Sequence, residues 1–487
     1  MLGSETAYAG RAKLRTTPYE LPGDKMPIYE MWLFPVDNPA GVQVAIEPID
    51  FHGPPALRWD QDARHFTFER TDRGHQRFRI VEVDAHSGAT RCLYEERSAT
   101  FINGVGEFTH YLGDSEIVRK SERDGWAHLY LIDRASLAVQ PITSGAWVVR
   151  SVDHVDPATR QIWFQASGRE AGEDPYHLRG YRVHCDGSGL VDLTPAPGHH
   201  RLQYSPDHDW VIDSCSTVAA PSVHRLRRAA DGSEVCELER ADASPLLATG
   251  WQPPEVFHAP GRDGTTEIWG LVTRPRSFDP ARQYPVIESI YAGPQDSHVP
   301  KQFGPNAGLE ALAELGFIVV QIDGMGTANR SKAFHDVCWQ NLGDAGLPDR
   351  IAWIQSLAAR YPQVDVSRVG VFGTSAGGQN VLSALLERGD FYRVGVASCG
   401  CYDNRMDKTW WNEQWMGYPL GPHYAAQSAI TNAAKLRGKL LLLVGELDNN
   451  VPPESTYRLV DALIKANKQF ELLVLPGVGH SDGGAYG

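Results

Sequence analysis

The stretch Val369-Gly-Val-Phe-Gly-Thr-Ser-Ala-Gly-Gly378 decides the fold of the second half of the chain. Its apolar start, residues 369–372, predicts a short buried strand, and residues 379–388 predict a helix. Between them lies a G-x-S-x-G motif, residues 373–377. Strand, sharp turn and helix in that order are the context in which this motif forms a nucleophile elbow, so we predict that Ser375 is a catalytic nucleophile. The alternative for a bare motif is an ordinary turn without chemistry.

The glycines around Ser375 have a physical reason under this prediction. An elbow serine sits in a strained backbone conformation, and the strand and helix pack too closely for side chains at the flanking positions. The N-terminus of the following helix also stabilises developing negative charge. We therefore expect an oxyanion to be held by the backbone N–H of Ala376 and by a second donor from the loop after residues 285–291.

Size, charge and hydropathy narrow the class of protein. A chain of 487 residues with 42% hydrophobic residues predicts two or three globular domains. The net charge of −14 argues against nucleic acid as a partner, because no basic excess is present to neutralise phosphates. No run of about 18 apolar residues occurs, so no membrane span is expected.

Targeting and cofactor signals are also lacking. The N-terminal Met-Leu-Gly-Ser-Glu-Thr-Ala has no apolar stretch, so no signal peptide is expected in the chain as given. The compartment is not specified: it is cytoplasmic, or periplasmic or secreted if an N-terminal segment is missing. The seven cysteines have neither C-x-x-C nor zinc spacing, which favours structural thiols, Cys399 and Cys401 included. No H-E-x-x-H, Walker A or dinucleotide motif appears, so we expect neither a metal nor a cofactor.

Residues 29–238 consist of short alternating runs separated by turn residues, which predicts β-strands. Phe66, Val118, Trp163 and Val211 occupy similar places in successive units, with a period of roughly 45 to 50 residues. Such a period with four strands per unit is typical of β-propeller blades. We predict a partial, propeller-like domain over residues 1–246, with about four full blades and part of another near Tyr29; a β-sandwich is the competing interpretation.

The second half alternates strands and helices, which predicts a doubly wound, mostly parallel sheet. Together with the elbow, this pattern predicts an α/β-hydrolase domain over residues 247–487. The predicted strands are residues 267–273, 285–291, 316–323, 369–372, 439–444 and 470–475, and the predicted helices are residues 306–315, 348–359, 379–388 and 454–466.

The order of a catalytic triad in this fold is serine, acid, histidine, and the sequence offers one histidine that fits. His480 follows the last predicted strand and is the only histidine after residue 448. The acid should follow the strand at residues 440–444, where Glu446 and Asp448 both lie, and Asp448 is the better placed. We predict that Ser375 attacks a carbonyl, His480 transfers the proton, and Asp448 holds the imidazole tautomer.

With these motifs in place, the chain resembles the prolyl oligopeptidase family, nearest its dipeptidyl peptidase IV branch. The resemblance covers nearly the whole chain and implies a serine peptidase that cleaves short peptides, with release of dipeptides as one expectation. Its propeller would limit access to the site. The motifs that carry the resemblance are Tyr19-Glu-Leu-Pro-Gly-Asp24, Ile290-Tyr-Ala-Gly-Pro-Gln295, Gly373-Thr-Ser-Ala-Gly-Gly378, Trp415-Met-Gly-Tyr-Pro419, Asp448-Asn-Asn-Val-Pro452 and Pro476-Gly-Val-Gly-His480.

Further roles follow from the resemblance alone. It implies that the phenol of Tyr291 is the second oxyanion donor and that Asn450 binds a substrate carbonyl. It also implies that Val451 lines the proline pocket, and it puts Trp411 where the family has a pocket tyrosine. Without the family, Tyr291 and Trp411 would be interpreted as core aromatics and Asn450 as a turn residue.

The sequence departs from the family at several points. The elbow is Thr-Ser-Ala where the branch usually has Trp-Ser-Tyr, and Asp403, Arg405 and Asp407 crowd a segment that is more aromatic in the family. Both changes weaken the expectation of strict proline preference. The paired glutamates that grip a substrate's amino terminus lie, in the family, ahead of this chain's start. The doublet Glu95-Glu96 lies in the wrong blade and is predicted to be a solvated strand end.

Few residues follow His480, where the fold normally adds a closing helix, so we expect the chain to be a fragment at both ends. Other functions compatible with these motifs are a carboxylesterase, an acylaminoacyl-type hydrolase, and a non-catalytic propeller and hydrolase protein that binds a partner. The sequence does not specify the oligomeric state, and a homodimer is one expectation.

Overall fold

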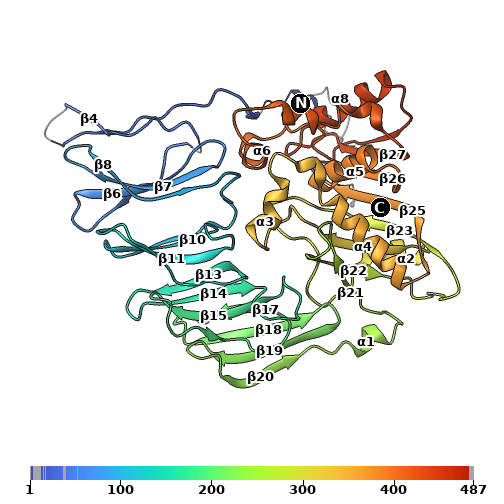
Figure 1. Cartoon of the computed structure of the whole chain (residues 1–487), viewed down its shortest axis with the longest axis horizontal. Coiled ribbons are helices and arrows are strands. Elements are labelled where there is room, and N and C mark those ends of the chain that lie inside the picture. Colours follow the sequence, from blue (N-terminus) through green and yellow to red (C-terminus); the bar gives the residue numbers. More distant parts are fainter. Residues whose placement is uncertain are drawn as a thin grey trace.

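The first half of the chain folds into antiparallel β-sheets (Figure 1). The computed structural model describes residues 2–3, 13–14, 16, 18–36, 40–51 and 53–481. Four four-stranded sheets follow one another, and each is formed by strands in chain order. They consist of β5 (Arg58–Trp59), β6 (His65–Thr71), β7 (Arg77–Asp84), β8 (Thr90–Arg97); β9 (Thr109–Leu112), β10 (Glu116–Ser121), β11 (His128–Asp133), β12 (Val139–Pro141); β13 (Val148–Asp156), β14 (Gln161–Ser167), β15 (Leu178–His184), β16 (Val191–Asp192); and β17 (His199–Tyr204), β18 (Trp210–Thr217), β19 (Ala220–Arg228), β20 (Glu234–Arg240).

These sheets are the repeats that the sequence predicts. Phe66, Val118, Trp163 and Val211 each lie in the second strand of their own sheet, and all four are buried. One sheet per repeat is the arrangement of propeller blades and differs from the two facing sheets of a sandwich. The prediction of a propeller-like region is therefore confirmed. Two shorter antiparallel pairs precede the blades: β1 (Leu2–Gly3) with β2 (Lys13–Leu14), and β3 (Trp32–Leu33) with β4 (Val42–Gln43).

Adjacent blades are held together by the apolar side chains between them. One buried cluster joins Val118 and Leu129 of the second blade to Val149 and Phe164 of the third. Every second residue of such strands points to the same face, so a blade with two apolar faces can stack on both neighbours. Figure 1 shows the resulting stack of sheets, with β6 and β7 at one end and β20 at the other.

The second half of the chain is built on one eight-stranded sheet with the order β21-β22-β24-β23-β25-β26-β27-β28. From β24 to β28 all neighbours are parallel, whereas β21 and β22 are antiparallel additions at one edge. The strands are β21 (Glu255–Pro260), β22 (Glu267–Thr273), β23 (Tyr284–Ser289), β24 (Ile318–Asp323), β25 (Val364–Thr374), β26 (Tyr392–Ser398), β27 (Lys439–Gly445) and β28 (Glu471–Leu475).

Strand order reverses at β23, which has β24 on one side and β25 on the other. At such a switch point the loops after the two strands diverge and leave room for a ligand beyond their carboxyl ends. The loops concerned carry Tyr291, after β23, and Ser375, after β25. The topology alone therefore brings two of the predicted site residues to one place.

The helices are α1 (Ser244–Leu247), α2 (Ala307–Glu314), α3 (Lys332–His335), α4 (Leu347–Arg360), α5 (Ala376–Glu387), α6 (Thr409–Met416), α7 (Pro422–Ala426) and α8 (Pro453–Lys465). Short 3₁₀ turns cover Asp336–Cys338, Leu342–Asp344 and Ala433–Lys435. Three predicted helices match α2, α4 and α8 within two residues. Helix α5 begins three residues earlier than predicted, because the turn at Ser375 leads directly into it. The predicted ranges do not include β21, β26 or the short helices α1, α3, α6 and α7.

A buried polar group ties the sheet together below the switch point. Glu288 on β23 receives hydrogen bonds from Arg350 of α4 at 2.7 Å and from the Tyr392 hydroxyl of β26 at 2.7 Å. The Arg350 and Glu288 side chains are both 0% exposed. Leaving either charge alone in the core would be costly, so the pair fixes how α4 and the two strands meet.

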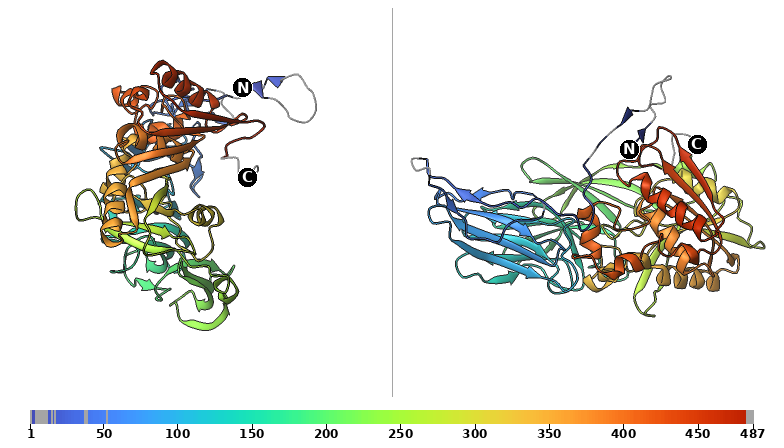
Figure 2. Two further views of the ribbon diagram at one scale, coloured as in Figure 1. Left: turned by 90° about the vertical axis from the view of Figure 1, so that its right-hand side faces the viewer. Right: turned by 90° about the horizontal axis from the view of Figure 1, so that it is seen from above.

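The two halves lie side by side, as the turned views show (Figure 2). The α/β-hydrolase prediction is confirmed by the mostly parallel sheet. The boundary between residues 246 and 247 stays a prediction; β20 ends at Arg240 and β21 begins at Glu255, with α1 between them. Of the described helices, none has both the length and the hydropathy needed to cross a bilayer. The expectations about a signal peptide and about a closing helix concern segments that lie largely outside the described residues.

Candidate active site

Ser375 occupies the sharp turn between β25 and α5, with φ 62° and ψ −123°. A positive φ is costly for a residue with a side chain and persists only where the surroundings enforce it. Here the Ser375 N–H donates to the Ser398 carbonyl of β26 at 2.9 Å, and its carbonyl accepts from Gln379 N–H at 3.2 Å. The backbone strain predicted for a nucleophile elbow is present.

The flanking glycines allow the close approach of strand, helix and neighbouring loop. A Cβ at Gly373 would lie 2.5 Å from the Ile290 carbonyl oxygen, and one at Gly378 would lie 2.5 Å from the Ser398 carbonyl oxygen. A Cβ at Gly377 would also lie 2.5 Å from the Ile290 carbonyl oxygen. Because these contacts are with backbone, no side chain could move aside, and any other residue would push α5 away from the sheet.

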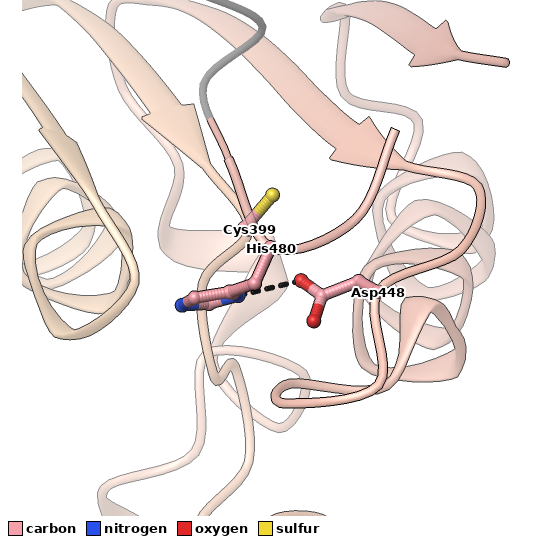
Figure 3. A group of neighbouring side chains, drawn as sticks. All are labelled: Cys399, Asp448 and His480. Carbon is pink, nitrogen blue, oxygen red and sulfur yellow. Dashed lines mark hydrogen bonds and ion pairs between the residues drawn. The ribbon is translucent and has the colours of Figure 1, made fainter. Parts of the chain in front are cut away.

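Asp448 and His480 form the closest contact between two predicted site residues, with His480 Nδ1 at 2.7 Å from Asp448 Oδ2 (Figure 3). The other carboxylate oxygen, Oδ1, accepts the backbone N–H groups of Asn450 and Val451, both at 2.9 Å. Asp448 is 0% exposed. The Asp-Asn-Asn-Val turn thus holds the carboxylate by one oxygen and leaves the other for the imidazole.

This arrangement selects between the two acids that the sequence offers. Asp448 is the acid that meets the ring, whereas Glu446 Oε2 accepts the Gly477 N–H at 2.9 Å. A carboxylate at Nδ1 favours the tautomer that carries its proton there, which leaves Nε2 as a proton acceptor. The pair of Asp448 and His480 therefore has the geometry of an oriented general base.

Ser375 lies at the same edge of the sheet as this pair. Its N–H is bonded to Ser398, and the next residue, Cys399, has its sulfur within 4.8 Å of ligand atoms of Asp448 and His480. Within residues 53–481, no hydrogen bond joins the Ser375 hydroxyl to the His480 ring. Catalytic hydrogen bonds are often long without substrate and tighten when it binds. The structure thus brings acid and histidine into contact and puts the serine after β25, which β26 separates from the strand that leads to Asp448.

Tyr291 and Ala376, the two predicted oxyanion residues, border the elbow. Ala376 is the first residue of α5, so its N–H belongs to the first turn and lacks an intrahelical acceptor. The Tyr291 ring lies against the elbow, since its Cδ2 is 3.4 Å from where a Cβ of Gly377 would be. The Tyr291 hydroxyl accepts a hydrogen bond from Gln295 Nε2 at 3.3 Å, and its ring centroid is 4.5 Å from that of His298.

The predicted substrate-binding residues do not all gather at one point. Asn450 and Val451 belong to the turn that holds Asp448, and Val451 is buried. Trp411 lies on α6, half-buried in an aromatic cluster that includes Trp415 and Phe101. Among the described residues, no hydrogen bond or ring contact joins Trp411 to another predicted site residue.

Tyr19, predicted only to be part of a family motif, is also a residue of this site. Its hydroxyl lies 2.6 Å from the Asn450 carbonyl oxygen and 2.6 Å from Asp407 Oδ1. Figure 1 shows how the N-terminal segment reaches this point by running from the first blades across to α6 and α8. Tyr19 thereby positions the turn that carries Asn450, and the same hydroxyl contacts the Asp407 carboxylate.

The crowded charges near Asp403 are paired. Arg405 donates to Asp403 at 2.8 and 2.6 Å, and Ser428 Oγ donates to the same carboxylate at 2.8 Å. Burial raises the pKa of Asp403, but the hydrogen bonds from Arg405 and Ser428 outweigh burial and hold this pKa below its usual value. These residues therefore brace the segment before α6.

A cavity of about 300 Å³ lies between the blades and the catalytic half. Gln295, which donates a hydrogen bond to the Tyr291 hydroxyl, is one of its lining residues. It is lined by acidic and basic side chains, among them Glu96, Lys120 and Glu122. Burial lowers the pKa of Lys120 to about 8 and raises that of Glu122. Such perturbed groups beside a catalytic edge are typical of a substrate-binding cavity.

Glu96 corrects one sequence-based prediction. Glu95 does lie at the surface, where it accepts from Arg77 and Arg97. Glu96, predicted to be a solvated strand end, is only 7% exposed and accepts a hydrogen bond from Tyr94 at 2.7 Å. The strand alternation turns one member of the doublet outward and the other inward, toward the cavity.

Comparison with known proteins agrees with this architecture. The model of the prolyl oligopeptidase family matches residues 305–486, and the model of the dipeptidyl peptidase IV N-terminal region matches residues 3–222. The sequence of residues 305–486 is thus that of a prolyl oligopeptidase family domain. The first match contains the elbow, Asp448 and His480, and the second contains most of the blades. The family resemblance predicted from the motifs is confirmed.

Individual proteins named dipeptidyl peptidase also match this chain over most of its length. The chain is 30% identical to human dipeptidyl peptidase 8 over 453 residues and 28% identical to the mouse protein over 456 residues. These matches cover 83% and 84% of this chain but 50% of each relative, so the chain spans about half their length. The crystal structure of Porphyromonas gingivalis dipeptidyl peptidase 4 superposes with a TM-score of 0.84 and 25% identity, covering 100% of this chain and 68% of that one.

Proposed function

We propose that this chain carries the catalytic centre of a serine peptidase that releases dipeptides from short peptides. The observation that carries the proposal is the elbow serine at the sheet edge where a buried aspartate orients a histidine. The match to the prolyl oligopeptidase family and the similarity to proteins named dipeptidyl peptidase support the reaction and the substrate class.

In the proposed reaction Ser375 Oγ attacks the scissile carbonyl while His480 Nε2 takes the serine proton. The carbonyl oxygen becomes an oxyanion, for which the Ala376 N–H and the Tyr291 hydroxyl are the proposed donors. His480 then delivers its proton to the leaving amine as the C–N bond breaks. Water, activated by the same imidazole, hydrolyses the acyl-enzyme and releases the dipeptide, while Asp448 stabilises the protonated ring.

Substrate recognition is proposed for Asn450, Val451 and Trp411. The Asn450 side chain would bind a peptide carbonyl, and Val451 and Trp411 would form apolar walls around the residue before the scissile bond. The Thr-Ser-Ala elbow lacks the aromatic wall that the branch usually has, so tolerance of residues other than proline is expected. The net charge of −14 supports peptides over nucleic acid as partners. A homodimer stays a prediction, which light scattering of the purified chain would test.

A substrate panel tests this function. The panel comprises dipeptidyl anilides with free and with acetylated amino termini, aminoacyl anilides and a nitrophenyl ester. We expect the free dipeptidyl anilides to be cleaved with kcat/KM at least about tenfold above the other amides, because an enzyme discriminates by contacts made in the transition state. Preference for acetylated substrates would favour an acylaminoacyl hydrolase, and turnover of the ester alone would favour a carboxylesterase.

Tyr291→Phe tests the proposed oxyanion donor. Loss of one such donor typically lowers kcat by roughly 10²- to 10³-fold with little change in KM, because the bond strengthens only in the transition state. Tyr361→Phe is the matched control, since Tyr361 caps the C-terminal end of α4 and its hydroxyl donates to Glu255 of β21. Equal kcat values for Tyr291→Phe and the wild type would remove Tyr291 from the mechanism without affecting the assignment of Ser375.

A further inference from the structure

A cysteine thiol lies beside the catalytic acid and histidine. The sulfur of Cys399, a carboxylate oxygen of Asp448 and a ring nitrogen of His480 all lie within 4.8 Å of one another. Cys399 is 1% exposed and Asp448 is 0% exposed. Figure 3 shows the three side chains on separate loops, with the contact between Asp448 and His480 dashed and the Cys399 sulfur turned away from that contact.

The fold holds this thiol in place through its backbone. Cys399 directly follows β26 and has a left-handed φ of 48°, and its N–H donates to the Leu443 carbonyl of β27 at 3.0 Å. Its sulfur lies 3.1 Å from the Ser481 carbonyl oxygen, on the loop that carries His480. The three side chains thus come from the loops after β26, β27 and β28, which are neighbours in the sheet.

A thiolate, an imidazole and a carboxylate are the ligands that zinc and related cations prefer. A tetrahedral zinc site needs its ligand atoms about 3.3 to 3.6 Å apart. The thiol would therefore have to move inward by about 1 Å, and the 2.7 Å contact between Asp448 and His480 would have to open to admit an ion. We propose that Cys399, Asp448 and His480 form an inhibitory site for one Zn²⁺ or Cd²⁺ ion. Long separations along the chain explain why cysteine spacing gave no sign of it.

Occupation of this site would switch off the proposed general base, an inference that rests on the proposed function. If the ion takes Nδ1, the neutral ring carries its proton on Nε2 and cannot accept one from Ser375. If the ion takes Nε2, the lone pair that would receive the serine proton is used directly. In both cases the thiol proton is released to solvent when the metal–sulfur bond forms, and a chelator reverses the change.

Cadmium binding can be measured without any substrate, by the ultraviolet charge-transfer absorption of a cadmium–thiolate bond. We expect one equivalent of Cd²⁺ to produce this absorption in the wild type and in Ser375→Ala. Cys399→Ser and Cys399→Ala should lose this absorption and bind Cd²⁺ at least about 100-fold more weakly. The reason is that loss of even a residue that only supports a metal ligand lowers metal affinity by about 10- to 100-fold. Cys401→Ser is the matched control, because that buried thiol contacts the Asp403 carbonyl and lies outside the cluster.

The activity measurement uses the same variants, with each rate divided by that variant's rate in chelator. Zn²⁺ and Cd²⁺ should inhibit the wild type and Cys401→Ser at concentrations at least about 100-fold below those that inhibit the Cys399 variants. Thiolate absorption that persists in Cys399→Ser, or is absent from the wild type, would overturn the proposal. Cadmium binding as expected in a chain that cleaves no peptide would instead refute the proposed function and leave the metal site intact.

Discussion

Ser375→Ala is expected to lower kcat/KM for dipeptidyl substrates by roughly 10⁵- to 10⁶-fold, the loss seen when a serine hydrolase is left with only binding and oxyanion contacts. Alanine at this position has no atom that can form the acyl-enzyme, and water would have to attack in its place. The strained backbone at residue 375 is held by Ser398 and by the packing of α5, so alanine should adopt it equally well. Steady-state rates at saturating and limiting substrate give both kcat and kcat/KM.

The control for this change is Ser383→Ala, on the same helix as the elbow. The Ser383 hydroxyl donates to the Gln379 carbonyl at 3.2 Å, so its removal alters α5 locally without touching the turn. We expect Ser383→Ala to keep covalent labelling by a fluorophosphonate and Ser375→Ala to lose it. Labelling that survives in Ser375→Ala, in a variant whose circular dichroism matches the wild type, would show that another residue is the nucleophile.

Local patterns in the sequence account for what could be predicted. Gly373 and Gly378 mark the elbow because backbone packs directly on them, and such a constraint acts within ten consecutive residues. His480 could be assigned because the order of strands in this fold leaves one histidine in the right loop. The blades could be predicted because alternation and turns repeat with each unit.

Contacts between distant parts of the chain could not be predicted from these patterns. Tyr19 reaches Asn450 across 431 positions, and Cys399 meets His480 only because β26 and β28 flank β27. Strand β25 begins at Val364, five residues before the predicted start, although Asp365 and Ser367 form a polar, turn-like sequence. Pairing with β23 extends that strand, and this kind of tertiary preference has no signal in local composition.

Asp448→Asn is the second large effect, with an expected loss in kcat of about 10⁴-fold and little change in KM. In the wild type Oδ1 accepts two backbone N–H groups and Oδ2 faces His480 Nδ1. An asparagine must keep its carbonyl oxygen toward those N–H groups, which turns its NH₂ group toward the ring. Nδ1 must then accept, so the ring proton moves to Nε2, and the imidazole can no longer take a proton from Ser375.

Glu446→Gln separates this tautomer effect from a general loss of negative charge in the loop. Glu446 Oε2 accepts the Gly477 N–H, and a glutamine oxygen can do the same, so kcat should stay within about threefold of the wild type. The two variants remove the same charge two residues apart, and only Asp448→Asn reverses a hydrogen bond to the imidazole. Similar losses in both would mean that charge near the site matters more than the tautomer of His480, and a loss confined to Glu446→Gln would exchange the two acids in the mechanism.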